Sequence, residues 1–141
     1  MSEKKAKIAR QFIAAIPHAN ALEMKIDEVF AGRATMSLPY NKKFVGDSAT
    51  GVLHGGVITA LLDTAMGTAV VSHPQCMGGT ATIDLRIDYM RGATPGQRIT
   101  AKAECYRVTR SVAFVRATAF DEGEAPVASA AGAFTVEGAK P

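Results

Sequence analysis

A long apolar segment in the middle of the chain constrains the fold more than any other feature. From Gly56 to Val71 almost every residue is apolar or small, and the length suits one ordinary helix. A surface helix would keep a polar face, so this pattern predicts a helix that is buried on nearly every side. One carboxylate, Asp63, interrupts it. At about 100° per residue, Ala60, Asp63 and Gly67 share one narrow stripe, where small neighbours would let a ligand or another backbone approach the acid.

The segments around this helix mostly alternate apolar and polar residues, as half-buried strands do. The pattern covers 24–30, 33–38, 80–91 (apolar face Ile83, Leu85, Ile87 and Tyr89), 98–109, 112–120 and 127–136. An amphipathic helix is predicted over 3–16, with Ser2 as a candidate N-cap and Pro17 closing it, and a loop over 40–53. Because a long antiparallel sheet needs one covered face, the sequence predicts an α+β fold in which about six strands wrap around the central helix.

Composition narrows the class of protein. A chain of 141 residues suits one domain, and its net charge of +3 permits an anionic small ligand but not the dense basic patch of a nucleic-acid-binding protein. The first residues lack an apolar signal core, and Asp63 interrupts the most apolar run, so we expect a cytoplasmic protein that makes no membrane contact. Cys76 and Cys105 stand alone, which indicates neither a disulfide framework nor a zinc site, and no metal is expected.

The residues that enter the central helix carry a family resemblance. Leu53-His54-Gly55-Gly56, followed by Leu62-Asp63 and a strand meander, resembles the hotdog-fold acyl-CoA thioesterases. More narrowly, it is similar to the phenylacetyl-CoA thioesterase-like branch, which includes the human thioesterase superfamily member 2 type. The resemblance covers residues 22–137, the expected hotdog domain, and leaves 1–21 as an N-terminal helical extension. It also rests on Ile83-Asp84-Leu85, Asp88-Tyr89-Met90-Arg91 and Ser111-Val112-Ala113-Phe114. It implies hydrolysis of an aryl- or medium-chain acyl-CoA to free acid and coenzyme A, which is part of the substrate, so no separate cofactor is expected.

Thioester hydrolysis needs a donor for the carbonyl oxygen as it becomes anionic, and a base or nucleophile at the carbonyl carbon. A glycine at a helix N-terminus offers a free backbone N–H without a Cβ, which favours Gly55 over Gly56, although a tight turn alone would also explain both glycines. Asp63 is the candidate general base or nucleophile. The alternative is a structural acid that bonds a neighbouring hydroxyl, Thr59 or Thr64.

Three further residues are expected to assist. His54 would orient the loop or the thioester, act as an acid or base, or only form a local hydrogen bond. The resemblance aligns Ser48 with a position where related enzymes carry Asn or Gln, and a hydroxyl there can still hold water or the thioester. It aligns Thr82 with a Ser that binds water or substrate, although Thr82 also suits an ordinary strand residue. Neither a second His nor a Cys is spaced to complete a triad with His54.

Coenzyme A carries phosphates, so basic and polar side chains are expected around its channel. The residues that the resemblance assigns to this role are Gly56, Tyr89, Arg91, Arg110 and Ser111. The alternative for the charged ones is that they are solvated residues at strand ends.

The spacing of the two central groups predicts a shared site. Gly55 and Asp63 are eight residues apart, which is about 12 Å along a helix axis. One thioester carbonyl has to lie about 3 Å from both groups, so one helix cannot supply both. A two-fold dimer can bring Gly55 of one subunit to Asp63 of the other, and the resemblance implies a homodimer that assembles further into a homotetramer. For the function as a whole, the alternatives to a thioesterase are a non-catalytic acyl-CoA-binding hotdog module and a hotdog dehydratase.

Overall fold

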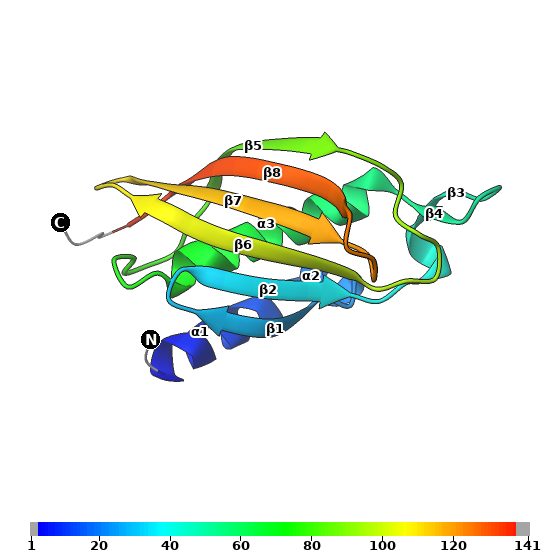
Figure 1. Ribbon diagram of the computed structural model, residues 1–141. Coiled ribbons are helices and arrows are strands. Elements are labelled where there is room, and N and C mark those ends of the chain that lie inside the picture. Colours follow the sequence, from blue (N-terminus) through cyan, green and yellow to red (C-terminus); the bar gives the residue numbers. More distant parts are fainter. Residues whose placement is uncertain (1–2, 138–141) are drawn as a thin grey trace.

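The computed structural model describes residues 3–137, so the candidate cap Ser2 lies outside the described residues. Two short helices precede two strands, a small hairpin, a long helix and four more strands (Figure 1). The helices are α1 (Glu3–Ala14), α2 (Pro17–Ala21) and α3 (Gly55–Ser72), with a single 3-10 turn, η1 (Lys42–Phe44). The strands are β1 (Lys25–Phe30), β2 (Arg33–Leu38), β3 (Val45–Asp47), β4 (Val52–Leu53), β5 (Thr82–Tyr89), β6 (Ile99–Val108), β7 (Val112–Phe120) and β8 (Pro126–Thr135).

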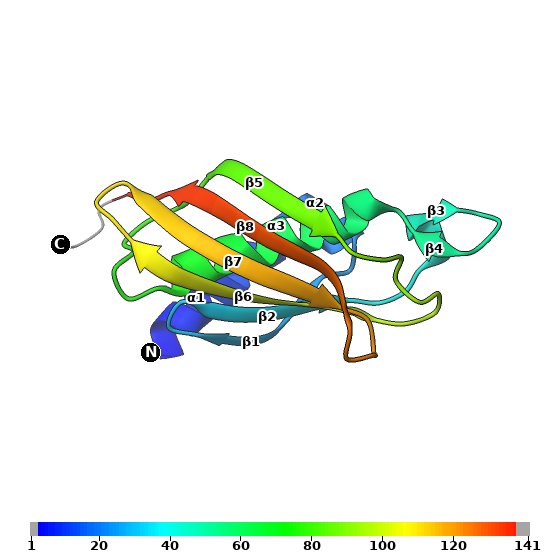
Figure 2. The same cartoon turned by 45° about the horizontal axis from the view of Figure 1, so that its top comes forward.

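Six strands form one antiparallel sheet in the order β1-β2-β6-β7-β8-β5. The helix α3 lies along one face of this sheet and packs mainly against β2, β6 and β7, while α1 packs beside α3 and β1 (Figures 1 and 2). Strands β3 and β4 form a separate hairpin that projects beyond the start of α3. The predicted α+β fold, a six-stranded antiparallel sheet around a long central helix, is confirmed.

Small residues on the inner face of the sheet let α3 approach it closely. In β6 the inward-facing Ala101 and Ala103 are buried, whereas Lys102 between them is exposed. From α3, which packs against β6, large side chains such as Leu62 and Met66 enter the same core and are fully buried. Burial of one such side chain contributes about 1.5–3 kcal/mol, so this interface accounts for much of the stability of the fold.

The central helix is buried on every side except one. Ala60, Asp63 and Gly67, which the sequence places on one stripe, are each partly exposed, whereas most other residues of α3 are buried. By length and composition alone α3 could cross a membrane, but most of it is buried inside this fold. The exposed stripe is therefore where another molecule can reach the helix.

Two predictions about local structure need correction. Pro17 does not simply close the first helix: α1 ends at Ala14, and Pro17 begins α2, because proline fits the first position of a helix. The segment 40–53 is not a plain loop, since it contains η1 and the β3–β4 hairpin. The predicted domain boundary after residue 21 falls between α2 and β1 and stays a prediction.

Strand β5 is an edge strand. It pairs with β8 on one side, and no other strand of the described residues pairs with its second side. Leu85 and Ile87 are half-buried against the core, but Ile83 and Tyr89, expected on the same apolar face, are 53% and 48% exposed. Both ends of β5 contact α3 through hydroxyl groups, and apolar surface remains exposed beside the helix.

Candidate active site

The N-terminus of α3 is capped by the side chain that precedes it. His54 has an extended backbone, and its Nδ1 accepts the Gly56 N–H at 2.8 Å. Nδ1 therefore presents its lone pair to Gly56, which leaves the proton of a neutral ring on Nε2. With its only lone pair used by the cap, the neutral ring can donate a hydrogen bond from Nε2 but cannot act as a base without breaking the cap.

The cap separates the two candidate oxyanion donors. The Gly56 N–H is used by His54, whereas the Gly55 N–H has no hydrogen-bond acceptor among the described residues, as expected at the first position of a helix. Gly55 also lacks a Cβ, so a carbonyl oxygen can approach its N–H closely. The geometry supports the preference for Gly55 over Gly56.

The hairpin before the helix holds His54 in place. The His54 N–H donates to the Phe44 carbonyl at 2.8 Å, and a Cβ at Gly46 would lie only 2.8 Å from His54 Cα. Only glycine permits this contact. The backbone on both sides of His54 is thus fixed before the helix begins.

The Asp63 carboxylate is half-buried on the exposed stripe of α3, and Thr82 Oγ1 at the start of β5 donates to its Oδ1 at 2.7 Å. The local partners considered from the sequence are used elsewhere: Thr59 Oγ1 donates to the Gly55 carbonyl at 3.2 Å, and Thr64 Oγ1 to the Ala60 carbonyl at 2.7 Å. Asp63 is thus oriented by one hydroxyl from another element, and its second oxygen, Oδ2, accepts no hydrogen bond from the described residues.

Ser48 lies apart from these groups. It is exposed in the turn of the projecting β3–β4 hairpin, where Asp47 accepts hydrogen bonds from the Ala49 N–H and the Thr50 hydroxyl. These bonds hold the pKa of the Asp47 carboxyl below its usual value. Within one chain, therefore, Ser48 is not brought to Asp63, and its predicted role depends on a partner subunit.

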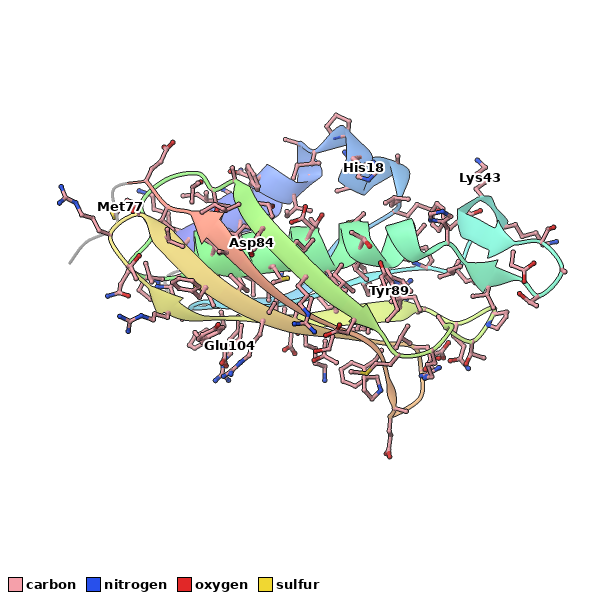
Figure 3. All side chains as sticks on the ribbon, turned by 90° about the horizontal axis from the view of Figure 1, so that it is seen from above. His18, Lys43, Met77, Asp84, Tyr89 and Glu104 are labelled. Carbon is pink, nitrogen blue, oxygen red and sulfur yellow. The ribbon has the colours of Figure 1, made fainter. Side chains whose placement is uncertain are left out.

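The expected coenzyme A contacts do not gather at one place. Tyr89 lies at the end of β5 beside the start of α3 (Figure 3), and its hydroxyl donates to the Gly55 carbonyl at 2.8 Å. Arg110 and Ser111 are exposed in the turn between β6 and β7. This turn lies near the start of β5, because Val112 after the turn pairs with Thr135, and the Thr135 hydroxyl accepts the N–H of Ala81 just before β5. Their roles stay predictions.

Arg91 is engaged inside the fold. Its guanidinium makes two bonds to the Asp121 carboxylate, of 2.7 and 2.9 Å, and one to the Ala125 carbonyl at 2.7 Å. The Asp121 side chain is buried, and this pairing holds its pKa well below the usual range while the same bond raises the pKa of Arg91. This pairing uses both terminal nitrogens of the guanidinium, whereas Nε makes no hydrogen bond with the described residues, and the predicted coenzyme A contact of Arg91 stays a prediction.

The sequence interpretation missed two residues of this region. Thr59 was considered only as a partner for Asp63, although a threonine in a helix often bonds the carbonyl four residues before it. Asp121 lies between two predicted strands, and its pairing with Arg91, thirty residues away, has no local signal.

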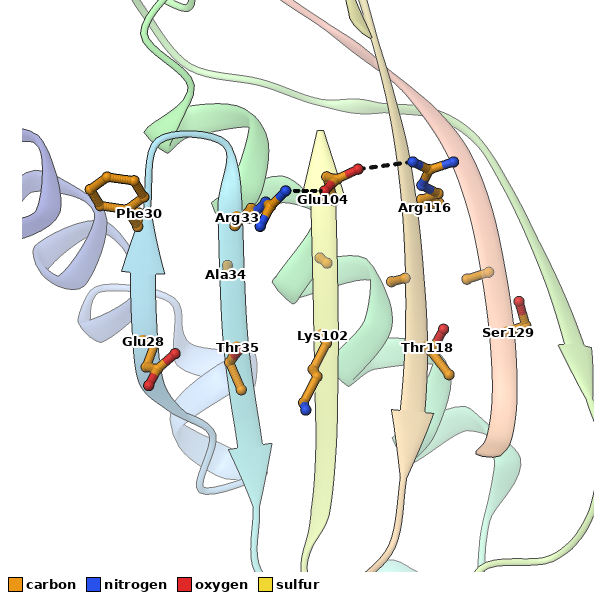
Figure 4. Close-up of a pocket in the computed structure, with 13 residues that line it drawn as sticks. Glu28, Phe30, Arg33, Ala34, Thr35, Lys102, Glu104, Arg116, Thr118 and Ser129 are labelled. Carbon is orange, nitrogen blue, oxygen red and sulfur yellow. Dashed lines mark hydrogen bonds and ion pairs between the residues drawn. The ribbon is translucent and has the colours of Figure 1, made fainter. Parts of the chain in front are cut away.

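A hollow in the described surface lies away from these groups. It measures about 680 Å³ and lies on the outer face of the sheet, opposite α3 (Figure 4). Its exposed side chains are mostly charged or hydroxylated, and Glu104 there pairs with both Arg33 and Arg116. It contains none of the candidate catalytic groups. Among the described residues, no three His, Cys, Asp or Glu side chains gather as a metal site would require.

Comparison with known proteins gives the same assignment as the fold. Residues 50–128 match the thioesterase superfamily. The medium/long-chain acyl-CoA thioesterase YigI of Escherichia coli is 30% identical over 142 residues, which cover 92% of this chain and 91% of YigI. A crystal structure of a Pseudomonas aeruginosa protein is 36% identical, with a TM-score of 0.84, and covers 94% of this chain and 99% of that one. The Escherichia coli PaaI protein from the phenylacetic acid degradation operon is 20% identical, with a TM-score of 0.86 over 99% and 97% of the two chains, a likeness of fold. With its six strands around one long helix, the chain belongs to the thioesterase superfamily and is a hotdog-fold thioester hydrolase.

Proposed function

We propose that this protein hydrolyses the thioester of acyl-CoA molecules to a free acid and coenzyme A. The observation that carries the proposal is a pair of groups left available along α3. The Gly55 N–H has no acceptor within residues 3–137, and the partly exposed Asp63 carboxylate is held by Thr82. A donor and an oriented carboxylate are the two groups that thioester hydrolysis requires.

In the proposed reaction the thioester carbonyl oxygen accepts the Gly55 N–H, which stabilises the negative charge that develops there. Asp63 takes a proton from a water that attacks the carbonyl carbon, or its own oxygen attacks and water then hydrolyses the resulting anhydride. In both routes the carbon–sulfur bond breaks and coenzyme A leaves as the thiolate. His54 keeps the helix N-terminus in place by capping Gly56.

Each site would be shared between two subunits. Gly55 and Asp63 are two turns apart on one helix, too far to act on a single carbonyl. The unpaired edge of β5, with exposed Ile83 and Tyr89, supports a dimer in which two β5 strands lie side by side across a two-fold axis. The exposed stripes of the two α3 helices would then face each other. A homotetramer built from such dimers and a cytoplasmic location belong to the same proposal.

The acyl group is proposed from the relatives and the open stripe. The name of YigI specifies medium and long acyl chains, and YigI aligns over nearly the whole of this chain. On α3 the residues one turn before and one turn after Asp63 are Ala60 and Gly67, which leave room for an apolar chain beside the carboxylate. We therefore propose medium- to long-chain acyl-CoA as the first substrate class, and an aryl-acetyl-CoA as the second.

A thiol-release assay tests this function. Purified protein is mixed with short-, medium- and long-chain acyl-CoA and with phenylacetyl-CoA. We expect release with at least one class, and a loss of at least about 100-fold in kcat for Asp63→Asn while substrate still binds. Asp88→Asn, an exposed acid on the same strand as Thr82, is the matched control and should keep full activity. Binding without thiol release from any substrate would indicate a non-catalytic module, and hydration of an enoyl-CoA instead would indicate a dehydratase.

A further inference from the structure

The peptide group between Gly55 and Gly56 is held at both of its polar ends. Its carbonyl oxygen accepts from the Tyr89 hydroxyl at 2.8 Å and from Thr59 Oγ1 at 3.2 Å. Its N–H donates to His54 Nδ1 at 2.8 Å. The Tyr89 and Thr59 hydroxyls also contact each other. Three side chains, one of them from a distant strand, thus converge on one peptide group.

This restraint falls where the backbone needs it. Two consecutive glycines have the widest choice of backbone torsions, so the first turn of α3 is the part of the helix that its own sequence fixes least. The carbonyl of the preceding residue, His54, accepts the Val57 N–H at 3.0 Å, and this bond spans both glycines in the helical turn that they form here. Holding the Gly55–Gly56 peptide therefore also holds the preceding peptide, whose N–H is the free donor of Gly55.

We infer that Tyr89 is a positioning residue that fixes the direction of the Gly55 N–H by holding the Gly55 carbonyl from strand β5, with Thr59 as its partner. This inference rests on the proposed function, in which that N–H binds the thioester oxygen. A preorganised donor stabilises developing charge without reorganising during the reaction, so loss of its fixed direction lowers the rate of the chemical step.

The alternative role for Tyr89 is contact with coenzyme A. A tyrosine hydroxyl has one proton, and here it is donated to the Gly55 carbonyl, so the hydroxyl cannot also donate to a phosphate or an amide of the ligand. A contact to coenzyme A would appear as weaker substrate binding. A positioning role appears in kcat, with KM nearly unchanged.

Tyr89→Phe removes the hydroxyl and keeps the ring, which lies at van der Waals distance (3.5 Å) from where a Cβ on Gly55 would be. We expect kcat to fall roughly tenfold, with KM and the inhibition constant of free coenzyme A within about twofold of wild type. Thr59→Val should lower kcat in the same way, and Thr59→Ser should restore it because the hydroxyl returns. Tyr106→Phe is the matched control, since Tyr106 is 50% exposed and its hydroxyl makes no hydrogen bond with the described residues.

A measurement on the backbone separates this inference from the proposed function. Amide hydrogen exchange of Gly56 and Val57, whose N–H groups donate to His54, is followed by NMR and should speed up at least about fivefold in Tyr89→Phe, while amides in the middle of α3 stay unchanged. If exchange is faster in Tyr89→Phe but the wild-type protein releases no thiol from any acyl-CoA, the positioning role stands and the proposed function is overturned. Unchanged exchange, or a Tyr89→Phe enzyme with normal kcat and raised KM, would overturn the inference.

Discussion

Replacing Thr82 by valine tests how far the orientation of Asp63 matters for catalysis. Thr82 Oγ1 donates to Asp63 Oδ1 at 2.7 Å, and it is the only hydrogen bond that the described residues make to this carboxylate. Valine has the shape of threonine and suits a strand, so the change removes the hydroxyl with little effect on β5. Thr82 pairs with Phe134 of β8, and that backbone pairing is retained.

The expected loss follows from the strength of this one bond. A hydrogen bond to a charged group contributes about 1.5–3 kcal/mol, and the lower end applies here because Thr82 is exposed. If the bond holds the carboxylate in the reactive direction, its loss costs about 1.5 kcal/mol in the transition state, which is roughly a tenfold lower kcat/KM. Thr82→Ser keeps the hydroxyl and should stay within about threefold of wild type.

The assay is steady-state thiol release with the best acyl-CoA substrate, together with the melting temperature of each variant. We expect melting temperatures close to that of wild type for both variants and lower activity only for Thr82→Val. If Thr82→Val were as active as wild type, the hydrogen bond would be a detail of strand packing, and Asp63 would be oriented by something other than Thr82.

Two further predictions concern the stability of the fold. Asp121→Asn should lower the free energy of unfolding by about 2 kcal/mol at neutral pH, because it removes the negative charge and one of the two oxygens that accept from Arg91. Since the folded protein holds the pKa of Asp121 below its usual range, this contribution is complete above about pH 5 and is lost as the pH falls below about 4. The difference in melting temperature between the wild-type protein and Asp121→Asn should therefore shrink in acid. A difference that stays constant with pH would contradict this account. Gly132→Ala should destabilise by about 1–3 kcal/mol in denaturant titration, since its Cβ would lie 2.8 Å from the Asp84 carbonyl oxygen. Gly79→Ala, where nothing lies within 4 Å of the added Cβ, is the control, and equal stability of the two variants would refute the packing argument.

Most elements of the fold were predictable because their patterns are long. The continuous apolar run gives α3 to within one residue at each end, and alternation over many residues gives the six strands of the main sheet. The β3–β4 hairpin was not predicted, because strands of three and two residues are too short to show alternation. Alternation also fails to show which strand lies at an edge, and for this reason the exposure of Ile83 was not foreseen.

The candidate site was predictable only in part. The position of Gly55 at the start of a helix followed from the sequence, and so did the partly exposed stripe that contains Asp63. A local hydrogen bond was one of the roles considered for His54, but its place as the helix cap was not predicted, because side-chain caps are usually Ser, Thr, Asp or Asn. The bonds from Thr82 to Asp63 and from Tyr89 to Gly55 depend on how β5 passes beside α3, which is set by tertiary packing rather than by local pattern.

The central claim is that one thioester carbonyl is served by Gly55 of one subunit and Asp63 of the other. Gly55→Pro removes the proposed donor, and proline suits this first helical position because His54 before it already has φ −61° and ψ 135°. Both the Gly55→Pro and the Asp63→Asn proteins should fold, and circular dichroism and the melting temperature of each variant check this. Each variant alone should be nearly inactive.

The measurement is thiol release after the two folded variants exchange subunits. With equal amounts and random exchange, half of the dimers are mixed, and each mixed dimer has one intact site out of two, so about a quarter of the wild-type activity should return. Exchange is verified by native mass spectrometry. Activity that stays at the level of the parents, despite verified exchange, would contradict a site shared between subunits.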